Sequence, residues 1–208
     1  MNAELQKISL FILGKFSVGK TSFINKYVKN EFNQYCSNTI GIDYCSKLIQ
    51  LPTGEKLEIL LYDTAGQEKF KAISFNIINN ADGIILMYDI TNRSSFDDFN
   101  QWIEIIKEAK GDNCPLILIG NKCDLEQRVI TQIEGELFAN EHGFSFEETS
   151  SKEGTNIKES VQLLILDIMK NKKLSRMKET EEYDILKTKP SFKISSNKKK
   201  EKKKKCCK

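Results

Sequence analysis

Short apolar runs alternate along this chain with longer segments in which apolar residues recur at every third or fourth position. Runs of this length, bounded by polar and turn residues, are typical of β-strands, and the wider spacing is typical of amphipathic helices. The predicted strands are 8–13, 43–50, 56–62, 83–89, 115–120 and 144–148. Their alternation with helices predicts an α/β domain with a six-stranded, mostly parallel sheet and helices on both faces. Turn residues at 51–55 (LPTGE) predict a hairpin, and therefore one antiparallel edge strand.

Start signals mark two of the predicted helices. Ser94 and Asp97 have the spacing of a capping box, and Thr131 and Glu134 repeat it. The apolar stripes that we expect to face the core are Phe96, Phe99, Trp102, Ile103 and Ile106 within 94–110; Ile133, Leu137 and Phe138; and Ile157, Val161, Leu164, Ile165 and Ile168 in a last helix. After about residue 170 the periodicity weakens. We expect 171–205 to be mostly disordered linker.

Charge is distributed unevenly along the chain. Residues 171–208 hold 15 basic and 5 acidic residues, whereas 1–170 hold 17 and 24. An acidic body with a basic tail argues against nucleic-acid binding by the whole protein. We expect one globular domain over 1–170, a flexible basic tail over 171–208, and a monomer. The cysteines lack metal-ligand spacing, and neither a signal peptide nor a membrane span is visible, which indicates a reduced, cytosol-facing protein.

The segment from Gly14 to Thr21 (GKFSVGKT) follows the first predicted strand and opens a helix. Glycines let the backbone wrap an anion with its N–H groups inward, and the helix N-terminus adds its dipole. Lys20 can reach the β- and γ-phosphates, and the Thr21 hydroxyl can bind Mg²⁺. The phosphate-binding residues expected here are Ser17, Val18, Gly19, Lys20, Thr21 and Ser22.

Two further polar motifs follow strand ends. Asp63 begins DTAGQE directly after a strand, where a carboxylate facing a phosphate loop can hold the Mg²⁺ shell. Asn121 begins NKCD after a later strand, and Asp124 can accept two N–H bonds from the N1/N2 edge of guanine. Adenine has no matching pair and would leave a buried carboxylate unpaired, which favours guanine. Lys122 can cover one face of the base, and ETSSK at 148–152 supplies a second wall through Ser150, Ser151 and Lys152.

In this order the motifs resemble the Ras superfamily of small GTPases over residues 7–170. The segments TIGIDY at 39–44, YDTAGQEKF at 62–70 and LMYDIT at 86–91, with the terminal Cys206-Cys207 pair, resemble its Rab branch. The resemblance implies a P-loop small G domain that binds GTP/GDP and Mg²⁺ and hydrolyses GTP. It also implies that the long polar connections 30–41 and 66–80 are switch loops that relax once the γ-phosphate is lost.

The resemblance also assigns roles to single residues. Thr39 binds Mg²⁺ through its hydroxyl and the γ-phosphate through its N–H, and Gly66 offers a second N–H. Phe32 packs edge-on against guanine, and the N–H of Ser151 bonds guanine O6. Gln67 positions the attacking water, while Lys20 and Mg²⁺ offset the developing charge. Because no arginine is evidently placed to assist, intrinsic hydrolysis should be slow and aided by a GAP.

Several positions depart from the family pattern. Phe16 stands where Rabs have a small residue, and its ring either crowds the catalytic water or swings out onto a switch loop. The partner-facing surface is less aromatic than in most Rabs, because it carries Ile77-Ile78-Asn79-Asn80 and Tyr62. The effectors of better-known members therefore cannot be assigned to this chain.

The tail carries eight Lys and one Glu between 198 and 208, next to Cys206 and Cys207. In Rabs such a pair is prenylated, and a basic run adds attraction to an anionic leaflet. We therefore expect a GTP/GDP switch in vesicle traffic on the cytoplasmic face of an intracellular membrane, cycling with cytosol and served by a GEF, a GAP, a GDI or escort protein and effectors. The alternatives are a GTP-binding scaffold with impaired hydrolysis and a non-membrane nuclear GTPase; a nucleoside kinase would leave Asn121, Asp124 and Gln67 without a role.

Overall fold

The computed structural model of this chain describes residues 5–33, 39, 42–51, 54–64, 78–111 and 114–188. The side chains of Ile42 and of residues 175–188 lie outside this description. Most of the two long connections predicted as switch loops, 30–41 and 66–80, also lies outside it.

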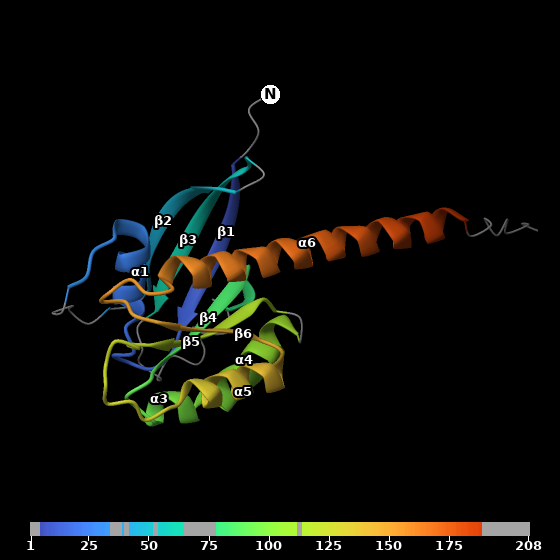
Figure 1. Cartoon of the computed structure of the whole chain (residues 1–208). Coiled ribbons are helices and arrows are strands. Elements are labelled where there is room, and N and C mark those ends of the chain that lie inside the picture. Colours follow the sequence, from blue (N-terminus) through green and yellow to red (C-terminus); the bar gives the residue numbers. More distant parts are fainter. Residues whose placement is uncertain are drawn as a thin grey trace, which may run out of the picture. The chain divides into compact units, whose positions relative to one another are not determined.

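One six-stranded sheet runs through the domain (Figure 1). Its strands are β1 (Gln6–Leu13), β2 (Ile42–Gln50), β3 (Lys56–Thr64), β4 (Gly83–Asp89), β5 (Leu116–Asn121) and β6 (Ser145–Thr149). Their order across the sheet is β2-β3-β1-β4-β5-β6, and β2 alone is antiparallel to its neighbour. The predicted fold class, including the single antiparallel edge strand, is confirmed.

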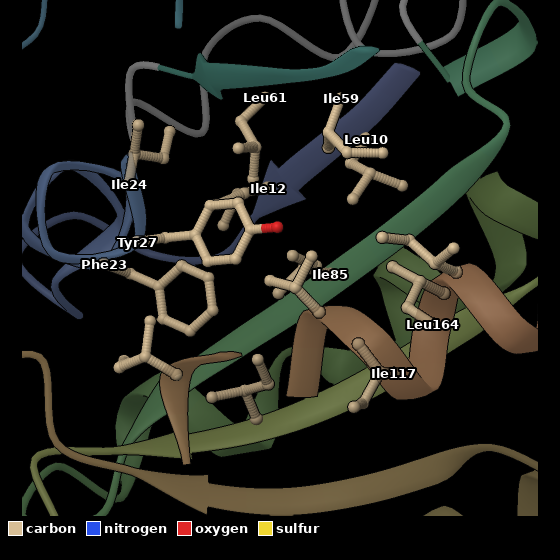
Figure 2. Close-up of a cluster of buried hydrophobic side chains, with 14 of the residues drawn as sticks. Leu10, Ile12, Phe23, Ile24, Tyr27, Ile59, Leu61, Ile85, Ile117 and Leu164 are labelled. Carbon is tan, nitrogen blue, oxygen red and sulfur yellow. The ribbon is translucent and has the colours of Figure 1, made fainter. Parts of the chain in front are cut away.

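The described helices are α1 (Lys20–Lys29), α3 (Ser94–Asp97), α4 (Phe99–Lys110), α5 (Gln132–His142) and α6 (Ile157–Thr188). The helices form two layers, and each layer covers its own cluster of buried side chains on one face of the sheet. The two clusters are distinct because alternate residues of each strand point to opposite faces of the sheet. In β1, Ile8, Leu10 and Ile12 belong to the cluster under α1 and α6, part of which is drawn in Figure 2. Phe11 and Leu13 belong to the cluster under α3, α4 and α5.

The helix predicted over 94–110 is two helices, α3 and α4, divided at Asp98. Asp98 leaves the helical conformation, with φ −85° and ψ 1°, and its carboxylate binds Lys15 at 2.7 Å. The predicted cap at Ser94 is wrong, since the Ser94 N–H and hydroxyl both donate to the Asn92 side chain at 3.2 and 2.9 Å. The cap at Thr131 is confirmed: its hydroxyl oxygen accepts from the Glu134 N–H at 3.2 Å.

The apolar stripe predicted for the helix that starts after Thr131 is also wrong in part. Ile133 and Leu137 on α5 are 68% and 64% exposed. The helix buries Gly135 and Ala139 instead, and Phe138 packs at the edge of the cluster. Because Gly135 lies against the Tyr88 hydroxyl and the Phe146 ring, α5 approaches the sheet through its small residues and leaves the larger aliphatic ones in water.

Helix α6 continues to Thr188. The expectation of a disordered linker over 171–205 is therefore wrong for residues 171–188. The later part of the helix is rich in Lys and Glu, which favour helix, and it ends just before Lys189-Pro190, where the helical conformation is disfavoured. The chain divides into two compact units, Met1–Asn171 and Lys172–Lys208. None of the helices in the described part combines the length and the apolar content that crossing a bilayer requires.

Candidate functional site

The loop between β1 and α1 has a shape that only glycine permits at two positions. Gly14 and Gly19 have φ of 146° and 103°, in the range that favours glycine. A Cβ on Gly14 would lie 2.2 Å from the Met87 carbonyl oxygen, and one on Gly19 would lie 2.3 Å from the Asn121 amide nitrogen. The loop is therefore held close to β4 and to the end of β5.

The first turn of α1 opens from this loop without the features that usually satisfy a helix start. Gly19 is its N-cap, it has no side-chain cap, and no acidic residue stands in the first turn, which includes Lys20, Thr21 and Ser22. Free N–H groups at a helix N-terminus attract anions. Val18 is buried, and Ser17 adopts a left-handed φ of 67°.

The Lys20 ammonium lies inside the loop. It donates to the carbonyl oxygens of Gly14 and Lys15, each at 2.8 Å, and the side chain is buried. Lys15 in turn reaches out to Asp98, at the junction of α3 and α4. A buried ammonium at the centre of a ring of backbone groups can stabilise a polyanion held by that ring.

Three oxygen-bearing side chains converge beside Lys20. Asp63 Oδ2 accepts hydrogen bonds from the Thr21 and Thr39 hydroxyls at 2.5 and 3.0 Å, and the two hydroxyl oxygens are 3.0 Å apart. Asp63 is buried, and its Oδ1 has no hydrogen-bond partner among the described residues. A buried carboxylate oxygen without a partner is costly, and two hydroxyls with one carboxylate form an oxygen set of the kind that Mg²⁺ accepts.

Burial raises the pKa of the Asp63 carboxyl above its ordinary value of 3.8. The hydrogen bonds from Thr21 and Thr39 and the positive charge of Lys20 oppose this rise, while Asp43 adds to it. A cation bound at Asp63 would remove the penalty, because it compensates the buried negative charge.

Asn121, the last residue of β5, joins the phosphate loop to the segment that follows β6. Its Nδ2 donates to the Val18 carbonyl at 2.8 Å. Its Oδ1 accepts from the Thr149 hydroxyl, the Ser151 N–H and the Ser151 hydroxyl at 3.1, 3.2 and 3.1 Å. The two loops therefore share one buried amide.

Asp124 and Lys122 complete this end of the sheet. The Ser150 hydroxyl donates to Asp124 Oδ1 at 2.6 Å, and the exposed Lys152 ammonium is 4.0 Å from Oδ2. The Lys122 ammonium binds Asp89 Oδ2 at 2.6 Å. The NKCD and ETSSK motifs are thus neighbours in space, at the carboxyl ends of two adjacent parallel strands.

Other predicted positions are not joined to this network. Phe32 is 41% exposed and Phe16, within the loop, is 54% exposed. Gly66, Gln67, Cys206 and Cys207 lie outside the described residues, so their roles, like those of the other site residues, remain predictions.

Sequence reasoning did not single out two residues that contact the side chains of the motifs: Asp89, and Thr149 within the ETSSK segment. Both end a strand at the edge that carries Asp63 and Asn121, and both bind the side chain of a motif residue. The signal that could have found them was their position, since polar residues at the carboxyl ends of parallel strands meet at one edge.

Comparison with known proteins places the chain in a family. Residues 9–170 match the Ras family. Ras-related protein Rab-12 of Homo sapiens is 36% identical over 190 residues, which cover 90% of this chain and 78% of that protein. Rab-8 of Diplobatis ommata is 38% identical over 87% of each chain, and Rab-3C of Bos taurus is 40% identical over 83% of this chain and 75% of its own. The chain therefore belongs to the Ras family of small GTPases, enzymes that hydrolyse GTP, and within that family it is of the Rab type.

Proposed function

We propose that this chain binds GDP and GTP with Mg²⁺ at the carboxyl edge of its sheet and acts there as a switch that recruits effectors in membrane traffic. The observation that carries the proposal is the convergence of the Thr21 and Thr39 hydroxyls on the buried Asp63 carboxylate, beside the Lys20 ammonium and the glycine-shaped loop. The comparisons with Rab proteins support it at the level of the family.

The metal would be held by Thr21, Thr39 and Asp63 together with the phosphates. Mg²⁺ is commonly bound by one or two carboxylates plus substrate phosphates, and so few protein ligands suffice. The orphaned Asp63 Oδ1 fits this assignment. When bound, Mg²⁺ supplies positive charge that offsets the charge of the β- and γ-phosphates.

Guanine would be selected by Asp124. Its carboxylate, oriented by the Ser150 hydroxyl, accepts the two N–H groups at the N1/N2 edge, and the Ser151 N–H donates to O6. Lys122 covers a face of the base, and Phe32 meets its edge.

For hydrolysis, Lys20 stabilises charge on the transferred phosphoryl group and Gln67 orients the attacking water. Arg93 and Arg128, the two arginines whose side chains are described, are bound to Glu134 and Glu148. A GAP that supplies an arginine would accelerate hydrolysis by on the order of 10³–10⁵. Loss of the γ-phosphate removes the partners of Thr39 and Gly66 together and releases both switch loops.

The basic tail would attach the domain to a membrane. Prenylation of Cys206 and Cys207 combined with the adjacent lysines gives the two signals that stable anchoring needs. We place the protein on the cytoplasmic face of an intracellular membrane, from which a GDI or escort protein returns it to the cytosol. Mass spectrometry of the C-terminus tests this part, because a tail without prenyl groups would indicate the nuclear alternative.

Identification of the nucleotide retained on purification tests the central proposal. We expect GDP or GTP on the wild-type protein and its loss on Asp124→Asn, with ATP binding far weaker in both. Equal binding of ATP, or no response to guanine nucleotides in the presence of Mg²⁺, would refute it.

Phe16, a bulky residue where the family pattern has a small one, is the reason to test one alternative, a GTP-binding scaffold that scarcely hydrolyses. Single-turnover hydrolysis with and without a GAP separates the two. A slow rate that a GAP accelerates supports the switch, whereas a rate restored only by Phe16→Ser and unaffected by a GAP supports the scaffold.

A further inference from the structure

Asp89 is a buried carboxylate that the functions assigned above do not use. It is the last residue of β4, its side chain is 9% exposed, and it pairs in register with Asn121 on β5. Buried carboxylates are uncommon and must be fully paired to be tolerated.

Both oxygens of Asp89 are engaged, in different directions. Oδ1 accepts the Thr91 N–H and the Thr91 hydroxyl at 2.9 and 2.7 Å. Oδ2 binds the Lys122 ammonium at 2.6 Å. The Asp89 N–H donates to the buried Ser95 hydroxyl at 3.0 Å, so the residue's own backbone is fixed as well. Asp89 is therefore a rigid anchor whose outward-facing contact is Lys122.

Lys122 has an unusual backbone that aims its side chain. Its φ is 68°, a left-handed conformation that is strained for a residue with a Cβ. Hydrogen bonds hold the chain on either side of it: the Ile90 N–H donates to the Asn121 carbonyl, and the Leu125 N–H to that of Lys122. The Cys123 N–H donates to the Thr149 carbonyl at 3.0 Å. Strain of this kind persists only where the surrounding structure holds it, and these hydrogen bonds fix the direction in which the Lys122 side chain leaves the backbone.

A lysine stem is flexible, and ordering it costs conformational free energy. Its four-carbon stem has several rotatable bonds, and on the surface it would sample many conformations. With its ammonium fixed by Asp89, the stem of Lys122 is held between two points, the backbone of the NKCD motif and the end of β4. A stem that is ordered before the ligand arrives binds without that cost.

We propose that Asp89 is a positioning residue that holds the Lys122 stem as a preformed platform for the purine ring of the bound nucleotide. The inference rests on the proposed function, because it needs a guanine base beside Lys122. The platform recognises the flat face of the ring, whereas Asp124 recognises its edge. Asp89 therefore controls how long a purine nucleotide stays bound, and Asp124 controls which purine is chosen.

A double-mutant cycle tests this assignment. Dissociation of N-methylanthraniloyl-GDP is measured with Mg²⁺ and excess GDP for wild type, Asp89→Asn, Lys122→Met and the double variant. Asparagine keeps the acceptor for Thr91, and methionine keeps an apolar stem without the ammonium. Asp97→Asn, an exposed carboxylate on α3 that binds Arg93, is the matched control.

We expect Asp89→Asn and Lys122→Met each to accelerate dissociation by about tenfold, as when one partner of a close charge pair is removed. The double variant should match the single ones rather than multiply their effects, because both changes cut the same contact. The preference for GDP over IDP, which lacks the 2-amino group that Asp124 binds, should stay unchanged in Asp89→Asn.

Three results would overturn the inference. The first is an Asp89→Asn variant that releases the labelled GDP at the wild-type rate. The second is an Asp89→Asn change that accelerates release equally in the wild-type and Lys122→Met backgrounds, because Asp89 would then act without Lys122 and have a purely structural role. If Asp89→Asn does not fold, Lys122→Met alone decides, and an unchanged rate contradicts the proposal. Failure of the wild type to bind the labelled GDP at all would refute the proposed function instead.

Discussion

The side-chain amide of Asn121, at the end of β5, donates a hydrogen bond to the backbone carbonyl of Val18 in the phosphate loop, 103 residues away in sequence. The same side chain accepts three hydrogen bonds from Thr149 and Ser151. One buried amide thus links the loop that would hold the phosphates to the loops that would hold the base.

Replacing this amide should weaken both the fold and the site. In Asn121→Ala the Val18 carbonyl and the Thr149 and Ser151 donors lose their partner, and each buried group left unpaired costs about 1–3 kcal/mol. We expect the free energy of unfolding to fall by about 3 kcal/mol in urea titrations and GDP to dissociate faster. Asn140→Ala, on the exposed side of α5, is the control and should change neither quantity. An unfolding free energy equal to that of the wild type would mean that the loops are held by other contacts.

The Asp63 carboxyl should destabilise the protein whenever no cation compensates it. Burial raises its folded-state pKa above 3.8, so the folded state releases its proton less readily than the unfolded chain. Below that ordinary pKa the carboxyl is protonated in both states and no penalty arises. As pH rises from there through the raised folded-state pKa, the penalty develops fully and stability falls.

Asp63→Asn should therefore stabilise the metal-free, nucleotide-free protein at pH 7 by on the order of 1 kcal/mol, because an unpaired amide costs less to bury than an unpaired carboxylate. The gain should shrink toward zero as the pH approaches 4. The same variant should lose the dependence of GDP affinity on Mg²⁺. Urea unfolding in EDTA at several pH values measures the first effect, and a variant less stable than wild type at pH 7 would contradict the account.

Much of the sheet follows from short, continuous apolar runs that are bounded by polar and turn residues. For β4 the predicted and observed bounds coincide at Gly83 and Asp89, since all seven of its residues are buried. The α3–α4 break was not predictable, because it depends on Asp98 meeting Lys15 from a loop more than 80 residues earlier. A pattern read within one segment cannot contain that contact.

The motifs of the site were predictable because each stands at a strand end. Their mutual contacts were not, since Asp89 and Thr149 act through side chains on neighbouring strands. The one helical stripe that failed, Ile133 and Leu137, failed because α5 packs through Gly135 and Ala139, which a hydrophobicity pattern ranks below isoleucine and leucine.

Ser17→Gly should stabilise the protein. The left-handed backbone of Ser17 costs an L-residue roughly 1–2 kcal/mol, while glycine adds about 0.5–1 kcal/mol of entropy to the unfolded chain. Because the Ser17 side chain is exposed, its removal costs no buried contact, and we expect a net gain of about 0.5–1 kcal/mol in urea titrations. Asn30→Gly, at φ 59° on the C-cap of α1, should gain less, because asparagine tolerates this conformation. Destabilisation by Ser17→Gly would show that its side chain has a role in the fold.

The exposed stripe of α5 and the buried residue just before it should differ strongly in how much a substitution destabilises the protein. Ile133 is 68% exposed, so Ile133→Gln removes little buried surface and should change the unfolding free energy by less than about 0.5 kcal/mol. Ile130 is fully buried, and Ile130→Ala should cost about 2–5 kcal/mol through lost burial and a residual cavity. Both are measured in the same urea titration with the nucleotide held constant, because a bound ligand adds its own stability. A loss above 2 kcal/mol for Ile133→Gln would mean that α5 turns its aliphatic face inward, as the sequence pattern alone predicts.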